Sequence, residues 1–155
     1  MNPQPTPQPI HILMVEDDPA DVRLTREALK NKIVLTTMDT VPDGVEAMAY
    51  LRKEDAYTDK LRPDLILLDL NMPRMDGREV LAELQKDPKL RKIPVIVLTT
   101  SEGEEDILAA YEMNANCYIT KPVDWKQFVR VVEVIEDFWL TVVRLPKELP
   151  KESYR

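Results

Sequence analysis

The sequence predicts one α/β domain in which helices cover both faces of a parallel β-sheet. Strand-like apolar runs alternate with helix-like segments five times along the chain, the order typical of a doubly wound sheet. The 155 residues are 44% hydrophobic and 32% charged, the balance of a soluble globular domain. The net charge of −7 argues against binding nucleic acid through a basic face. No apolar run is long enough to span a membrane.

Five short segments are expected to form the strands. Four are nearly continuous apolar runs, as in strands buried on both faces of a sheet, and the second is recognised by its β-branched content. A continuous apolar run can also be a piece of buried helix, but Pro63 before the third run and the turn residues after it favour a strand. The expected strands are residues 10–15, 32–38, 65–68, 93–98 and 115–119.

A helix is expected after each strand, at residues 19–31, 45–53, 78–85, 102–113 and 125–143. Asp18 before Pro19 is a favourable N-cap, and Asp124 is expected to cap the last helix. Residues 1–9 contain four prolines and read as a flexible arm. We therefore divide the chain into the arm at 1–9, the domain at 10–143 and a charged tail at 144–155.

Chemically distinctive side chains follow four of the expected strands. They are Glu16, Asp17, Asp69, Thr99 and Lys121. In open α/β sheets, ligands bind outside the carboxyl ends of the strands. With a flavodoxin-like strand order of 2-1-3-4-5, the first and third strands are neighbours, so Asp17 and Asp69 would converge. Clustered carboxylates raise one another's pKa unless a cation lies between them, and hard oxygen ligands suit Mg²⁺.

This set of residues indicates phosphoryl transfer. An aspartate such as Asp69 is ionised at neutral pH and can attack phosphorus to form an acyl phosphate. The metal, Lys121 and Thr99 would offset the charge on the transferred group. Taken singly, each residue has an ordinary structural explanation: Asp69 could cap a turn, Thr99 could bond to backbone, and Lys121 could be a surface charge.

The sequence has a single histidine and a single cysteine. His11 is the one histidine, and on an apolar strand we expect it to be a packed side chain rather than a ligand or a phosphodonor. Cys117 is the one cysteine, which excludes an internal disulfide and suits a reducing compartment. A cytoplasmic location is therefore expected.

Several motifs together resemble the receiver domain of two-component response regulators. They are Glu16-Asp17, Leu68-Asp69-Leu70-Asn71-Met72-Pro73 with Asp76-Gly77, Val97-Leu98-Thr99 and Tyr118-Ile119-Thr120-Lys121-Pro122. The resemblance covers residues 10–139. It implies a single-domain response regulator, not an enzyme in the ordinary sense, because such a domain catalyses only its own phosphorylation and dephosphorylation.

The resemblance also implies roles for individual residues. Asp69 would accept a phosphoryl group from a phosphohistidine on a sensor histidine kinase. Asp17, Asp69 and the Asn71 carbonyl would bind Mg²⁺ directly, and Glu16 would bind it through water. Thr99 and Tyr118 would be the switch pair, and Lys121 would precede Pro122 through a cis peptide bond.

A few positions qualify the resemblance. Glu16 stands where aspartate is commoner in the family, and Thr100 stands where a small residue is usual and could narrow access to the phosphoryl group. Asn71 and Ser101 lie at positions that tune acyl-phosphate lifetime in the family. Once Asp69 is phosphorylated, Thr99 would move to hydrogen-bond the phosphoryl oxygens and vacate space that Tyr118 can enter. This movement would remodel the face formed by the fourth helix, fifth strand and fifth helix.

The last expected helix carries more apolar surface than one buried face needs. At about 100° per residue, its apolar residues cover an arc of about 200°, whereas a stripe of a little over 100° suffices to face a core. We expect the surplus at Val131, Val134 and Phe138 to form a homodimer interface, unless residues 145–154 cover it. This helix, the Phe138-Trp139 pair and the tail also resemble small stand-alone regulators paired with cyanobacterial phytochromes, which makes a phytochrome the expected kinase.

Other functions fit the sequence less well. A phosphatase of the haloacid dehalogenase type places a second aspartate two residues after its nucleophile, where this chain has Asn71. A flavodoxin-like cofactor binder would need a phosphate-cradling loop in place of Glu16-Asp17-Asp18. A transcription factor would need a DNA-binding domain, for which the short tail has no room. The remaining alternative is a receiver-like interaction module that acts without phosphorylation.

Overall fold

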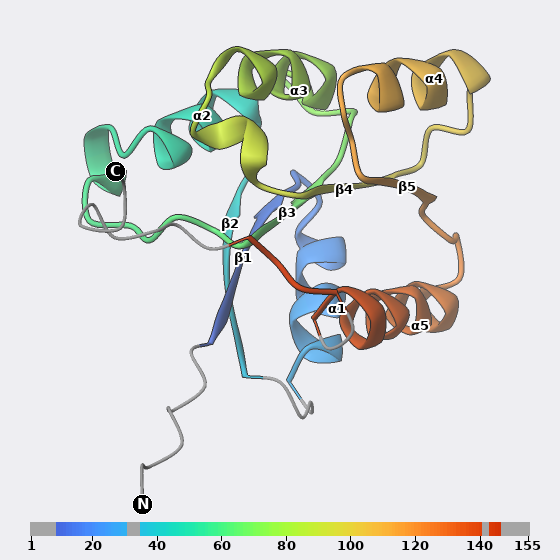
Figure 1. Ribbon diagram of the computed structural model, residues 1–155. Coiled ribbons are helices and arrows are strands. Elements are labelled where there is room, and N and C mark those ends of the chain that lie inside the picture. Colours follow the sequence, from blue (N-terminus) through green and yellow to red (C-terminus); the bar gives the residue numbers. More distant parts are fainter. Residues whose placement is uncertain (1–8, 31–34, 141–142, 147–155) are drawn as a thin grey trace, which may run out of the picture.

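The structure is a computed structural model that describes residues 9–30, 35–140 and 143–146. Its core is a five-stranded parallel sheet with the order β2-β1-β3-β4-β5 (Figure 1). The predicted flavodoxin-like fold and strand order are confirmed. The strands are β1 (Ile10–Val15), β2 (Thr36–Val41), β3 (Leu65–Leu68), β4 (Val95–Thr99) and β5 (Cys117–Thr120).

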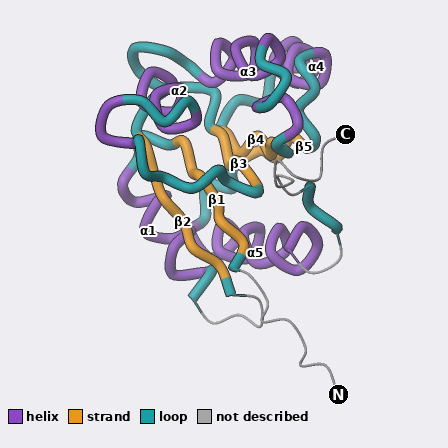
Figure 2. The backbone as a smooth tube through the Cα atoms, turned by 60° about the vertical axis from the view of Figure 1, so that its left-hand side comes forward, coloured by secondary structure: helices purple, strands orange, loops and turns teal. Residues whose placement is uncertain are grey.

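Helices cover both faces of the sheet, as Figures 1 and 2 show from two directions. α1 and α5 lie on one face, and α2, α3 and α4 lie on the other. Short 3₁₀ turns occur at Asp55–Tyr57 and Leu90–Lys92, and α5 continues into a π-helical turn at Glu136–Leu140. The α-helices are α1 (Pro19–Ala28), α2 (Gly44–Leu51), α3 (Gly77–Lys86), α4 (Glu104–Glu112) and α5 (Trp125–Ile135).

The strands divide their side chains between two hydrophobic clusters. Leu13 and Ile66 belong to the cluster that includes residues of α2 and α3, whereas their chain neighbours Ile12 and Leu65 belong to the cluster beneath α1 and α5. This division follows from the two-residue period of a strand. All four residues of β3 are buried, and each such side chain contributes about 1.5–3 kcal/mol. The edge of the sheet that β3 helps to form is therefore firmly held.

Aspartate caps fix where four of the helices begin. The N-caps of α1 and α5 are Asp18 and Asp124, as predicted, and Asp43 and Asp76 cap α2 and α3. Each carboxylate accepts a hydrogen bond from a backbone N–H of the first turn, an interaction worth about 1 kcal/mol. The residue before α4 is Gly103, which has no side chain to offer.

Most elements lie within a few residues of their predicted positions. The second strand is displaced the most: it was expected at 32–38 and is found at Thr36–Val41, while residues 31–34 lie outside the described ranges. β2 is the edge strand next to β1, and an edge strand tolerates polar residues such as Asp39 and Thr40 that the apolar pattern did not favour. The register that pairs Val15 with Val41 decides its extent.

The last helix is shorter than the sequence predicted. The last helix was expected to reach residue 143, but its α-helical part ends at Ile135, before the π-helical turn, and residues 141–142 are not described. His11 is packed, as predicted: its Nδ1 lies 2.8 Å from the Thr37 hydroxyl and its Nε2 lies 2.6 Å from the Tyr50 hydroxyl. Within the described ranges, every helix is too short or too polar to cross a membrane.

Candidate phosphoryl-transfer site

Three carboxylates meet at the carboxyl edge of the sheet. Glu16 and Asp17 follow β1, and Asp69 follows β3. The two strands are neighbours in a register that pairs Val15 with Leu68, so the residues after them emerge side by side. One carboxylate oxygen from each of the three lies within 4.8 Å of the others. Glu16 and Asp69 are buried, whereas Asp17 is exposed. The structure thus brings Asp17 and Asp69 together, as the sequence predicted.

The Lys121 ammonium pairs with two of these carboxylates and with a further one, Asp21. Its Nζ donates a hydrogen bond to Glu16 Oε1, lies 2.9 Å from Asp21 Oδ2 and is 3.5 Å from Asp69 Oδ2. Lys121 reaches the site because it follows β5, and its backbone N–H donates to the Thr99 carbonyl at 2.7 Å. The lysine is buried, so its charge acts at short range in a region of low dielectric.

Asp21 is a member of this group that the sequence argument missed. It lies in the first turn of α1, and that turn opens at the same edge of the sheet as Asp69. The sequence signal that could have identified Asp21 is its short distance along the chain from β1. A residue in the first turn of a helix that directly follows a strand stays close to the end of that strand. Its hydrogen bond to Lys121 ties α1 to the site.

The electrostatics favour a bound cation. Burial raises the pKa of Glu16 to about 7; the nearby Asp69 charge also raises it, while the Lys121 hydrogen bond opposes the rise. Burial disfavours the Lys121 ammonium, but its hydrogen bonds to Glu16 and Asp21 outweigh burial and raise its pKa above the ordinary range. The site thus binds positive charge, as a proton or an ammonium, at neutral pH. A divalent cation would stabilise the same carboxylates.

The residues present fit a hard divalent metal ion. All the donors are oxygens, which suits Mg²⁺ or a similar cation. Asn71 lies beside them: its backbone N–H approaches Asp69 Oδ1 at 3.3 Å, and the residue is exposed. A hollow of about 290 Å³ adjoins the group and is lined in part by Glu16 and Asp17. The acidic group can therefore be reached from solvent.

The turn after Asp69 explains the Asp76-Gly77 pair. A Cβ at Gly77 would stand 2.2 Å from the Asp69 carbonyl oxygen, so only glycine permits α3 to begin this close to the strand end. The Gly77 N–H donates to the Leu70 carbonyl at 3.0 Å, and Asp76 caps α3 through the Glu79 N–H at 3.0 Å. Together these contacts hold the loop of residues 70–77 beneath Asp69.

Thr99 and Tyr118 lie on neighbouring strands beside the acidic group. Thr99 ends β4, is fully buried and pairs in register with Thr120 of β5. Tyr118 is half-buried, and its hydroxyl donates to the Ser101 carbonyl at 2.9 Å. The Tyr118 hydroxyl is therefore tied to the segment that follows Thr99.

One expectation about the site is wrong. No peptide bond is cis among the described residues, which include Lys121 and Pro122. The cis bond was implied by the family resemblance alone, whereas an X-Pro bond prefers the trans form by about 0.5–1 kcal/mol. Lys121 reaches its carboxylate partners from a trans peptide.

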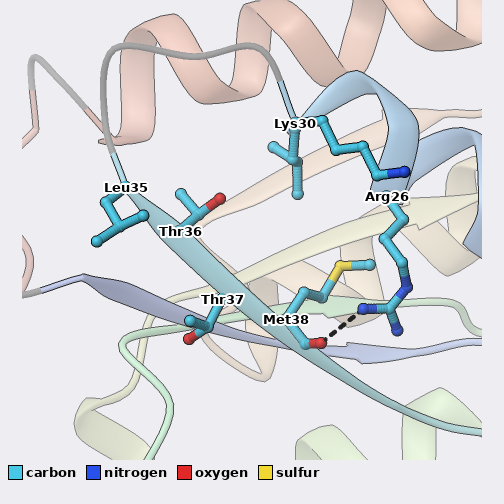
Figure 3. Close-up of a pocket in the computed structure, with 7 residues that line it drawn as sticks. Arg26, Lys30, Leu35, Thr36, Thr37 and Met38 are labelled. Carbon is cyan, nitrogen blue, oxygen red and sulfur yellow. Dashed lines mark hydrogen bonds between the residues drawn. The ribbon is translucent and has the colours of Figure 1, made fainter.

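A second hollow lies away from this site, at the end of α1 and the start of β2 (Figure 3). It measures about 340 Å³. Figure 3 shows Arg26 directed at the Met38 carbonyl, to which Nη1 donates at 2.9 Å. Lys30 pairs with Glu27 at 2.9 Å. In a parallel sheet this is the amino edge, opposite to Asp69, so the hollow takes no part in the site.

Comparisons with known proteins agree on one family. The response regulator receiver domain matches residues 12–133 of this chain. Response regulator Rcp1 of the cyanobacterium Synechocystis is 50% identical over 135 residues, which are 87% of this chain and 92% of Rcp1. The crystal structure of the phosphorylated cyanobacterial phytochrome response regulator RcpA is 53% identical with a TM-score of 0.88, and the match covers 90% of this chain and all of RcpA. The Mn²⁺-bound form of Rcp1 is 49% identical with a TM-score of 0.87, at 90% coverage of this chain and 100% of that structure.

Proposed function

This chain belongs to the response regulator receiver family, and on that premise we propose that Asp69 accepts a phosphoryl group from a sensor histidine kinase of the phytochrome class. Receiver domains are signalling proteins rather than classical enzymes. The observation that carries the proposal is the buried Asp69 carboxylate, grouped with Glu16 and Asp17 and 3.5 Å from the Lys121 ammonium. The phytochrome connection rests on the similarity to RcpA.

The metal in this proposal is Mg²⁺. Asp17, Asp69 and the Asn71 carbonyl would bind it directly, and Glu16 would bind it through water. The all-oxygen donor set supports this choice, and a Mn²⁺-bound form is known for the relative Rcp1. When bound, the ion supplies positive charge that offsets the charge of the phosphoryl oxygens.

The chain's own residues then have distinct tasks in the transfer. An Asp69 oxygen forms a bond to phosphorus as the bond from phosphorus to the donor imidazole nitrogen breaks, which leaves an acyl phosphate and a free histidine. The Lys121 ammonium pairs with the incoming phosphoryl oxygens and with Asp69, and the Thr99 hydroxyl donates to another of these oxygens. Because Lys121 is already held by Glu16 and Asp21, it needs little reorganisation.

Phosphorylation would change a surface formed by α4, β5 and α5, which we call the output face. Thr99 moves toward the phosphoryl group, and Tyr118 gives up its contact with Ser101 and turns into the vacated space. The local packing supports this role, because all four residues of β5 are only half-buried. Exposed Leu108 and Tyr111 on α4 and exposed Trp125 on α5 offer the apolar surface that a partner could contact.

We also propose that two chains dimerise through α5 and the turn that follows it. Of the three residues predicted to face a partner, Val134 is 59% exposed and Phe138 is 51% exposed. Val131 instead packs partly against the cluster beneath α1 and α5, as does Leu145. Most of the tail that could have covered this surface, residues 147–155, lies outside the described ranges. The cytoplasmic location, the absence of nucleic-acid and membrane partners, and the division into arm, domain and tail stay predictions.

The experiment that tests this function is intact mass after incubation with acetyl phosphate and Mg²⁺. Wild type should gain one phosphoryl group, and Asp69→Asn should gain none because the nucleophile is gone. Asp59→Asn is the matched control, since Asp59 is an exposed aspartate in the loop before β3. Light scattering on the same samples shows whether the dimer depends on phosphorylation. If no adduct forms and beryllofluoride does not bind, the protein is instead an interaction module that acts without phosphorylation.

A further inference from the structure

We propose that Asp106, held by Arg78, is a positioning residue of the phosphoryl site that fixes Ser101 and the segment following Thr99. The inference rests on the proposed function and concerns the control of that site. Ser101 lies two residues after Thr99, between β4 and α4. Any movement of Thr99 toward a phosphoryl group must be accommodated by this segment. The contacts that hold the segment therefore influence how readily the site switches.

Ser101 is held from three directions. Its hydroxyl donates a short hydrogen bond to Asp106 Oδ2. Its carbonyl accepts the Tyr118 hydroxyl at 2.9 Å. Its backbone N–H is 3.5 Å from Thr99 Oγ1, at the outer limit of a hydrogen bond. The side chain of Ser101 is thus tied to α4 and its backbone to β5.

Asp106 is in turn anchored to α3 by Arg78. Arg78 Nε donates to Asp106 Oδ1 at 3.0 Å, and Nη2 lies 2.8 Å from Oδ2, so the pair is bidentate. This fork geometry fixes the orientation of a carboxylate better than a single contact does. The Ser101 hydrogen bond and the Arg78 guanidinium lower the pKa of Asp106, consistent with an ionised carboxylate that accepts from both.

Apolar burial contributes little to holding α4 on the domain. All nine residues of α4 are described, and Ala110 alone among them is buried. Small apolar burial gives a small free energy of packing. A cavity of about 70 Å³ between α3 and α4, lined mainly by apolar side chains including Leu81 and Met113, also touches Arg78 and Asp106. The ion pair therefore bridges a loosely packed boundary, and its loss should loosen both α4 and the segment after Thr99.

Hydrogen exchange of the unphosphorylated protein tests this positioning role without any donor. In Asp106→Asn and in Arg78→Gln, the amides of residues 100–107 should exchange roughly fivefold faster, the effect expected for the loss of one charge-assisted hydrogen bond. The double variant should exchange no faster than Asp106→Asn alone, because that single change already removes the ion pair that Arg78→Gln breaks. Arg52→Gln is the matched control: it breaks the exposed Arg52–Glu83 pair at 3.1 Å and should leave these amides unchanged.

The second measurement is the rate of phosphorylation by acetyl phosphate. Because a loosened segment lets Thr99 move more readily, Asp106→Asn should be phosphorylated a few times faster than wild type, and Ser101→Ala/Asp106→Asn should match Ser101→Ala. If wild type accepts a phosphoryl group but the amides of Asp106→Asn and Arg78→Gln exchange no faster than those of wild type, the positioning role is overturned and the proposed function stands. Faster exchange in the variants of a protein that accepts no phosphoryl group supports the positioning of Ser101, and the proposed function is then what fails.

Discussion

The acidic site and the output face meet at β5, whose end delivers Lys121 to the site, but the two regions are held in opposite ways. At the site, Lys121 is buried and contacts three carboxylates, two that directly follow β1 and β3 and one in the first turn of α1. At the output face, α4 buries one alanine and every residue of β5 is half-exposed. The site is held by charges in a desolvated setting. At the output face, α5 is anchored by buried Phe128, Val132 and Ile135, whereas α4 and β5 bury little apolar surface.

On the proposed function, this difference would separate the chemistry of the domain from its signalling. Phosphoryl transfer needs groups fixed in place before the reaction, because a site that is already organised does not have to rearrange at the transition state. A switch needs an element whose alternative arrangement costs little free energy. The buried site would meet the first need, and the weakly buried α4 and β5 would meet the second.

The largest effect is expected from removing the positive charge that organises the site. Lys121→Gln should leave the buried Glu16 and Asp69 carboxylates unpaired and lower the free energy of unfolding by about 3 kcal/mol. Mg²⁺ should restore part of that loss, because the ion would offset the same charges. Urea unfolding with and without Mg²⁺ measures both effects. Lys86→Gln, at an exposed lysine paired with Glu83 at 3.3 Å, should change stability by less than about 0.5 kcal/mol.

A change of pH should alter the stability of the protein through one carboxylate of the site, Glu16. The pKa of Glu16 is raised from 4.5 to about 7, so the folded protein holds a proton that the unfolded chain releases. Protonated Glu16 therefore stabilises the folded state fully below about pH 4.5, and this stabilisation is lost as the pH rises through about 7. The full change is on the order of 3 kcal/mol. Urea unfolding across this pH range measures the free energy of unfolding of wild type and of Glu16→Gln. The value for wild type minus that for Glu16→Gln should fall as the pH rises.

Glu112→Gln is the control for this pH series, because Glu112 is exposed on α4. Its difference from wild type should stay flat over the same pH range. A flat difference for Glu16→Gln as well would mean that Glu16 is ionised throughout, and that Lys121 rather than a proton balances it.

The smallest effect on stability is expected from a substitution in α5, at the output face. Val134→Glu places a charge on an exposed position of α5 and should change the free energy of unfolding of the monomer by no more than about 0.5 kcal/mol. It should nevertheless abolish the dimer, because a buried unpaired charge at an interface is costly. Light scattering at several protein concentrations measures the molar mass and so the fraction of dimer. Val45→Glu, at an exposed valine of α2, should leave the molar mass unchanged, and a dimer that survives Val134→Glu uses another surface.

Much of this protein was predictable from local sequence. The apolar runs, the caps at Asp18 and Asp124 and the glycine after Asp76 each follow from a short-range rule: strand burial, N–H capping or close backbone approach. The same rules located Asp69, Thr99 and Lys121 at strand ends, and the alternation of strands and helices was enough to predict that these ends share one edge.

Tertiary structure alone decided the remaining features, because each depends on residues far apart in the chain. The extent of β2 follows from its register with β1, and the contact of Asp21 with Lys121 follows from the packing of α1 beside the end of β5. The Ser101–Asp106–Arg78 chain joins three separate elements through side-chain geometry that no spacing encodes. Sequence by itself determined which residues stand at the edge of the sheet, whereas packing and long-range electrostatics decided which of them touch.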